Sequence, residues 1–200
     1  NVFYNAQSEF AEVWESYGGT PVAIVGNTFI AGPDTKSNAI GVVRQRIAST
    51  GPARVFVADN DFIGKFLLKD HDLAEITLDR PDCPLTVAPA SPQAAYARVL
   101  AMAGAFPRDA LDRQVVDEVE RREGSIVHSP GTIPAIAASR APADTDRDGM
   151  PDDWEDAHGS NPDLPDAWKD ANGNGLANIE EWLEERHQQL MGGVRSSSTS

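Results

Sequence analysis

The chain has 200 residues, enough for one domain and a small module, and its formal net charge is −14 at pH 7. Fourteen of its 31 acidic residues but only three of its 17 basic residues lie between Asp144 and Leu190, so the acidity is concentrated late in the sequence. A basic stripe that would suit nucleic acid and an apolar run long enough to cross a membrane are both absent, so neither partner is expected.

Short β-branched and aromatic runs fill residues 1–90, and three of them share a pattern in which Asn precedes Phe by two positions. These are Asn1–Phe3, Asn27–Phe29 and Asn60–Phe62. Their spacing fits a parallel β-helix, in which the Asn amide of each coil pairs with the next coil and the Phe points into the interior. Hairpins of an ordinary sandwich, with Asn-x-Phe as turn chemistry, remain the alternative.

Polar insertions that carry Gly and Pro separate these runs, and such insertions usually gather on one face as a binding surface. Arg44 and Arg46 alternate as in a strand, and Lys65 and Lys69 lie near Phe66. These four cations are candidate contacts for an anionic ligand. Side chains of this kind also commonly lie in solvent or pair with local acids.

Two amphipathic helices are predicted within residues 91–122. Ser91 is a suitable cap for the first, and Pro92 suits its first helical position. Because they directly follow the strands, the two helices suit a lid over the open end of a stacked core. Residues 128–143 contain Pro, Gly, Ala and Ser without a period and are predicted to be a linker.

Residues 144–155 have the spacing of a twelve-residue EF-hand calcium loop, and residues 170–181 repeat it. Calcium takes about six to eight oxygen ligands, and alternating Asp residues on a bending loop turn every second side chain inward. The predicted ligands are Asp144, Asp146, Asp148, Met150 (through its carbonyl), Asp152 and Glu155, then Asp170, Asn172, Asn174, Leu176 (through its carbonyl), Asn178 and Glu181. The second loop offers only two carboxylates, which lowers its expected affinity.

The last predicted helix begins near Asn178, where Glu181 completes a capping box. Trp154 and Trp168 are expected to pack against the apolar face of this helix. Residues 191–200 end in Ser and Thr and are predicted to be disordered.

In this order, the pieces resemble the C-terminal part of secreted pectate lyases of the right-handed parallel β-helix type. Besides the tandem calcium loops, the resemblance is carried by Asn1–Asn5, Val25–Pro33, Ala103–Ala105, Pro107–Asp109, Val115–Val116 and Gly124–Ile126. It implies a mainly β fold, with the C-terminal coils of a β-helix and its two capping helices over residues 1–127. The linker, a tandem calcium module over residues 144–190 and a disordered tail would follow.

The resemblance also implies a function, the calcium-dependent cleavage of polygalacturonate by β-elimination. Polygalacturonate is an anionic sugar polymer, which Arg44, Arg46, Lys65 and Lys69 would then contact. A basic side chain would remove the proton on C5, and calcium on the uronate carboxylate would make that proton more acidic. The family's catalytic acids and Arg motif precede the segment that resembles Asn1–Asn5, so no catalytic residue is assigned here. We therefore expect a fragment of a longer extracellular enzyme, inactive alone and monomeric, with calcium as its cofactor. The single cysteine, Cys83, rules out an internal disulfide.

Two other interpretations stay open. A dockerin-like module would use its paired calcium loops to anchor a passenger to a scaffold, although the residues that follow the two loops differ. The second is a non-catalytic β-helix that binds polysaccharide or acts as an adhesin, because such a protein would share the features of this chain.

Overall fold

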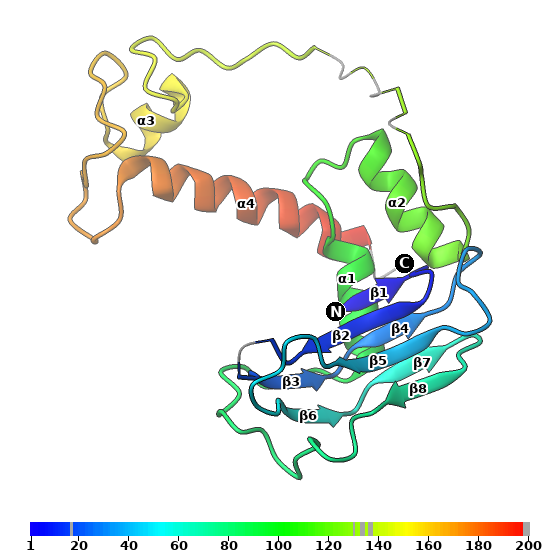
Figure 1. Cartoon of the computed structure of the whole chain (residues 1–200). Coiled ribbons are helices and arrows are strands. Elements are labelled where there is room, and N and C mark those ends of the chain that lie inside the picture. Colours follow the sequence, from blue (N-terminus) through cyan, green and yellow to red (C-terminus); the bar gives the residue numbers. More distant parts are fainter. Residues whose placement is uncertain (17, 130, 133–134, 136–137, 198–200) are drawn as a thin grey trace. The chain divides into compact units, whose positions relative to one another are not determined.

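A computed structural model describes residues 1–16, 18–129, 131–132, 135 and 138–197 (Figure 1). The chain divides into two compact units. The first comprises Asn1–Gly104 and Ala110–Thr132, and the second comprises Ala105–Asp109 and Ile133–Ser200. The predicted linker, residues 128–143, includes positions outside the described residues, namely 130, 133–134 and 136–137.

The first unit contains eight short strands that pair in parallel in three sheets (Figure 1). Neighbouring strands within each sheet are three strands apart in the sequence, in the orders β1-β4-β7, β2-β5-β8 and β3-β6. The strands are β1 (Val2–Tyr4), β2 (Glu9–Trp14), β3 (Pro21–Val25), β4 (Thr28–Ile30), β5 (Ile40–Gln45), β6 (Arg54–Ala58), β7 (Asp61–Ile63) and β8 (Leu68–His71).

The Asn-x-Phe repeats lie in register across the first sheet. Asn1 donates its side-chain N–H to Oδ1 of Asn27 at 2.9 Å, and Asn27 donates to Oδ1 of Asn60 at 2.9 Å. The ring of Phe29 stacks on two neighbouring Phe rings, with centroid distances of 4.8 Å to Phe3 and 4.9 Å to Phe62. The predicted pairing of amides and inward packing of Phe are confirmed. The hairpin alternative is wrong, because the strand pairs in these sheets are parallel.

The predicted fold class is nevertheless wrong. The described residues form short parallel strands in three small sheets together with four helices, and nothing in them shows a right-handed β-helix. The strands have only three to six residues, whereas the helices have seven to 20, so the fold is not mainly β. The Asn-x-Phe repeat specifies that neighbouring segments pair side by side, but it specifies neither the handedness of the chain path nor the extent of the sheets.

Apolar side chains from all three sheets form the core of the first unit. In β2, for example, Phe10 and Val13 are buried, whereas Glu12 and Trp14 are exposed. Burial of such side chains is the main stabilising contribution to the unit. The buried core residues are Phe10, Val13, Phe29, Ala39, Val42, Ala53, Val55, Leu73 and Ile76.

Two helices complete the first unit, α1 (Pro92–Met102) and α2 (Ala110–Arg121). As predicted, Ser91 caps α1, because its Oγ accepts a hydrogen bond from the backbone N–H of Ala94 at 3.3 Å. Helix α1 lies against β1 and β4. Helix α2 has no buried residue. Of the two predicted capping helices, α1 is therefore the one that packs closely against strands.

The second unit contains α3 (Asp152–His158) and α4 (Asn178–Ser197). Trp154 contacts α4 through a polar group, since its Nε1–H donates to Glu185 at 2.8 Å, and its packing against the apolar face of this helix stays a prediction. Trp168 is 81% exposed, so the predicted packing of its ring is wrong. Helix α4 continues through residues 191–197, where the sequence predicts disorder, and residues 198–200 lie outside the described part. Of the helices in the described residues, none is both long and apolar enough to cross a membrane.

Candidate metal centre

The first predicted calcium loop, residues 144–155, is bent by hydrogen bonds from its own backbone to its carboxylates. Gly149 donates its N–H to Asp144 at 3.2 Å, and Asp148 donates its N–H to Asp146 at 3.1 Å. Gly149 has a φ of 101°, a left-handed conformation that glycine adopts without strain. The loop therefore folds around its acidic side chains and draws them together.

Four carboxylate oxygens in this loop are buried without any hydrogen-bond partner. They are Oδ1 of Asp144, Oδ2 of Asp146 and both oxygens of Glu155, whose side chain is fully buried. An unpartnered buried carboxylate is costly. Burial, followed by the charges of nearby Asp residues, raises the pKa of Glu155 to about 7, and burial also raises the pKa of Asp146.

The acidic groups form two overlapping clusters that share Asp148. Asp144 and Asp146 belong to the first cluster, Glu155 and Asp166 belong to the second, and within each cluster the ligand atoms lie within 4.8 Å of one another. The carboxylates of each cluster repel one another. A divalent cation between them would offset this repulsion and would bind the buried oxygens that have no hydrogen-bond partner. The set offers oxygen ligands only, which suits a hard cation such as calcium.

The structure departs from the predicted ligand set at two places. Both carboxylate oxygens of Asp152 accept hydrogen bonds from Thr145, one from its N–H at 2.7 Å and one from its hydroxyl at 2.8 Å. Asp152 belongs to neither of the two clusters. Asp166 was not predicted, because it lies 11 positions beyond the loop, where no spacing rule applies. Met150, the predicted carbonyl ligand, is fully buried.

The second loop has positive φ angles at the same two positions as the first but a different arrangement of side chains. Gly173 and Gly175 have φ values of 75° and 95°, at the places that Arg147 (65°) and Gly149 (101°) occupy in the first loop. The amides of Asn172 and Asn174 both donate to the Glu181 carboxylate. Both oxygens of Asp170 accept hydrogen bonds from backbone N–H groups, those of Gly173 and Gly175, so both carboxylates of this loop are bonded within it.

The remaining predicted ligands of the second loop do not converge. Leu176 is 47% exposed, whereas Asn178 is buried. The side chain of Asn178 accepts a hydrogen bond from the N–H of Ala171 at 3.0 Å and donates to Asp166. Asn178 therefore connects the second loop to the site of the first, and the second loop is the weaker candidate.

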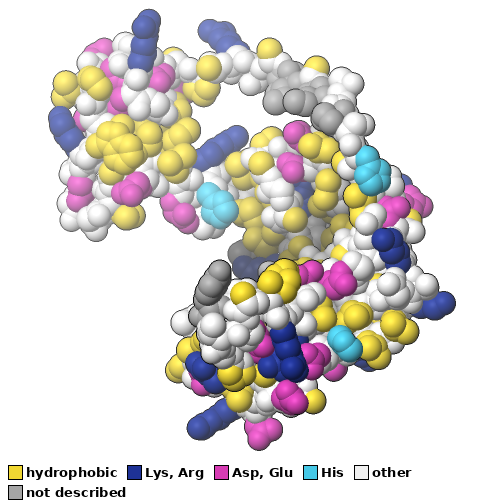
Figure 2. All heavy atoms as spheres, in the orientation of Figure 1, with side chains coloured by type: hydrophobic (Ala, Val, Ile, Leu, Met, Phe, Trp, Pro, Cys, Tyr) yellow, Lys and Arg dark blue, Asp and Glu magenta, His cyan; other side chains and the backbone are white. Residues whose placement is uncertain are grey.

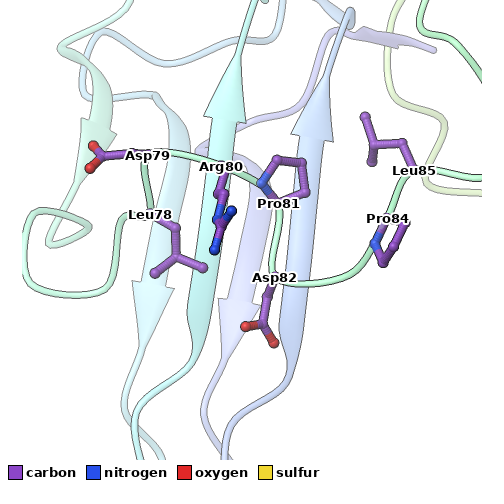
Figure 3. A pocket seen from close by; sticks show the side chains of 7 residues that line it. All are labelled: Leu78, Asp79, Arg80, Pro81, Asp82, Pro84 and Leu85. Carbon is purple, nitrogen blue, oxygen red and sulfur yellow. The ribbon is translucent and has the colours of Figure 1, made fainter.

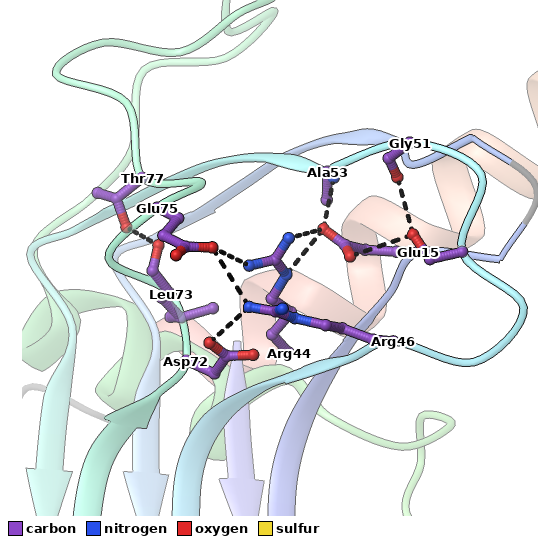
Figure 4. A network of polar contacts seen from close by, with 10 residues as sticks. Glu15, Arg44, Arg46, Gly51, Ala53, Asp72, Leu73, Glu75 and Thr77 are labelled. Atoms are coloured by element: carbon purple, nitrogen blue, oxygen red, sulfur yellow. Dashed lines mark hydrogen bonds and ion pairs between the residues drawn. The ribbon is translucent and has the colours of Figure 1, made fainter.

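The four predicted sugar-contacting cations are not brought together. The Arg44 side chain is 6% exposed and pairs with Glu15 at 2.8 Å and with Glu75 at 3.3 Å (Figure 4). On the face shown in Figure 2, basic side chains of the first unit lie beside acidic ones. Arg44 is thus bound to acids of its own chain, which is the alternative stated above, and contact with a sugar does not fit it.

The other three predicted cations are more accessible. The Arg46 side chain is 49% exposed and pairs with Asp72 at 2.9 Å. Lys69 lies over the ring of Phe62 at 5.8 Å, and Lys65 is exposed. Contacts of Arg46, Lys65 and Lys69 with an anionic sugar stay predictions.

Replacing Glu15 by glutamine is expected to remove part of the acid sensitivity of the first unit. Hydrogen bonding to Arg44 lowers the pKa of Glu15 below its usual 4.5. The carboxylate therefore stabilises the fold fully above pH 4.5, and this contribution is lost as the pH falls through its lower folded-state value. Urea unfolding across this range should show a steeper decline for the wild type than for Glu15→Gln. Equal slopes would contradict the prediction, and Glu12→Gln, an exposed change on β2, is the control.

The surface of the first unit also has a hollow, formed by residues 78–85 where they cross β3 and β6 (Figure 3). Asp82 is paired with Arg54 at 2.9 Å. The labelled side chains come from one continuous loop and point in different directions, so they present no convergent set of groups (Figure 3). Within the described residues, both carboxylate clusters that suit one cation lie between Asp144 and Asp166.

Comparison with known proteins gives two curated relatives. The chain is 29% identical over 178 residues to a protein named "Probable pectate lyase C" from Aspergillus flavus, and equally so to one of the same name from Aspergillus oryzae. Each match covers 84% of this chain and 42% of the relative, so the chain spans less than half of their length. No family model and no solved structure matches. The similarity supports a relation to the pectate lyase family.

Proposed function

We propose that this chain is part of an extracellular pectate lyase that cleaves polygalacturonate or pectin by β-elimination. The similarity to two proteins named "Probable pectate lyase C", over 84% of the chain, carries the proposal. In such a reaction a base removes the proton on C5, next to the uronate carboxylate, and the bond to the leaving sugar breaks. No catalytic residue is assigned within this chain. Because the polymer belongs to the plant cell wall, an enzyme that cleaves this polymer works outside the cell that produces the enzyme.

We further propose that residues 144–155 bind calcium, and that the ion stabilises the second unit rather than taking part in catalysis. The buried, unpartnered oxygens of Asp144, Asp146 and Glu155 support this proposal. The ion would neutralise these carboxylates and tie the loop to α3, which begins within it at Asp152. Affinity in the range of extracellular modules, with dissociation constants of about 10⁻⁴–10⁻³ M, would suit a secreted protein.

The lyase proposal is tested with the natural protein that contains these 200 residues. Incubation with polygalacturonate and calcium should yield an unsaturated product that absorbs in the near ultraviolet. Galactan is the control substrate, because it lacks the carboxylate that makes the C5 proton acidic. Absence of product from both polygalacturonate and pectin, at saturating calcium, would refute the proposal.

The dockerin-like alternative gains no support from the helices that follow the two loops. A docking surface with two equivalent faces needs two similar loop–helix copies. Helix α3 has seven residues and α4 has 20, so the copies differ in length as well as in sequence.

A further inference from the structure

We propose that Asp166 is a ligand of the cation bound by residues 144–155, supplied from outside the loop. The inference rests on the proposed calcium site and adds to it a residue that the twelve-residue spacing does not include. Asp166 would replace Asp152, the predicted ligand inside the loop, as a ligand of the cation.

The first support is the position and burial of Asp166. It is 9% exposed, and ligand atoms of Asp166, Asp148 and Glu155 all lie within 4.8 Å of one another. Glu155 is fully buried in this cluster, and neither of its carboxylate oxygens has a hydrogen-bond partner. The cluster is therefore a buried site with unmet bonding capacity, unlike a group of surface acids.

The second support is that hydrogen bonds hold Asp166 in place from two sides. The N–H groups of Asp166 and Ala167 both donate to Oδ2 of Asp148, at 3.0 and 2.8 Å. The side-chain amide of Asn178 donates to the carbonyl oxygen of Asp166 at 3.0 Å and to Oδ1 at 3.2 Å. These bonds fix a third carboxylate beside two others, although like charges at such distances repel each other. A cation between them removes that repulsion.

The third support is the geometry of Asp152. Thr145 donates to both oxygens of this carboxylate, so Asp152 closes the start of α3 onto the loop. With Asp166 included, the site offers the carboxylates of Asp144, Asp146, Asp148, Glu155 and Asp166, all from two neighbouring segments of the second unit. Calcium accepts mono- and bidentate carboxylates from separate segments, because its coordination geometry is flexible.

The test is calcium binding by Asp166→Asn, measured by titration calorimetry on the whole chain. Asn keeps the size of the side chain and an oxygen acceptor for Asn178, but it removes the charge. We expect calcium affinity to fall by about 10-fold or more, since affinity follows the number of charged ligands. Asp163→Asn is the matched control, because Asp163 is exposed in the same segment, and its affinity should stay within about 2-fold of the wild type.

Thermal unfolding separates a ligand from a structural residue. In excess chelator, Asp166→Asn should melt at or above the wild-type temperature, because one repelling carboxylate is gone. In calcium, the variant should melt below the wild-type temperature. Wild-type affinity in Asp166→Asn, or destabilisation that is equal in chelator and in calcium, would overturn the inference while leaving the calcium site intact. A wild-type chain that binds no calcium would refute the proposed site and the role of Asp166 together.

Discussion

Replacing Glu155 by glutamine should weaken calcium binding by the first loop about 100-fold, because it removes a charged ligand that can bind through two oxygens. At a calcium concentration about 100 times the dissociation constant, one site adds about 2.7 kcal/mol of stability, and most of this should be lost in the variant. In chelator the effect on stability should reverse, and Glu155→Gln should be more stable than the wild type. Glu155 is fully buried and its pKa is raised to about 7, so an uncharged side chain relieves a cost that the ion otherwise offsets.

Calorimetry and melting curves in calcium and in chelator measure both effects. Glu184→Gln makes the same chemical change at an exposed position on α4 and should leave binding unchanged. Since the ion is proposed to be structural, polygalacturonate turnover by the natural protein should be nearly the same for the wild type and Glu155→Gln. A large loss of turnover with unchanged calcium binding would contradict this assignment.

Replacing Phe29 by alanine should destabilise the first unit by about 3–5 kcal/mol, the usual cost of deleting a buried aromatic side chain. The ring is fully buried, is stacked between Phe3 and Phe62, and meets Phe10 edge to face at 6.3 Å. Truncation would leave a cavity bordered by three strands and would also remove aromatic pairs worth about 0.5–1.5 kcal/mol each.

The measurement for Phe29→Ala is urea unfolding, followed through the transition that does not respond to calcium. Leu67→Ala is the control, because Leu67 is 60% exposed and its truncation should change the free energy of unfolding by about 0.5 kcal/mol or less. A loss below about 1 kcal/mol for Phe29→Ala would show that the stacked rings are not the centre of the core.

Local features of both units could be predicted from the sequence, because short-range rules govern them. The repeat of Asn and Phe predicts strands that lie in register, and the structure pairs Val2 with Thr28 and Thr28 with Asp61. The positions of Gly149 and Gly175 predict the turns of the two loops, and both residues have positive φ. These signals depend on residues close together in sequence or on a direct repeat.

The failures concern contacts between residues that no repeat relates. Arg44 is buried because Glu15, 29 positions earlier, lies beside it, and neither residue alone signals the pair. Asp166 joins the carboxylate cluster of the first loop because its backbone N–H bonds to Asp148, 18 positions earlier. The fold class was wrong for a related reason, since a stacking pattern in the first 90 residues does not determine how much of the chain becomes helix.

Calorimetric titration of the chelator-treated wild-type chain with calcium tests the central claim most directly. We predict saturable binding with a dissociation constant at or below about 1 mM, and calcium should raise the melting temperature of the second unit in the wild type. In Glu155→Gln the tightest site should be lost. Absence of binding at calcium concentrations well above 1 mM, or binding that Glu155→Gln leaves unchanged, would contradict the assignment of residues 144–155 as a metal centre.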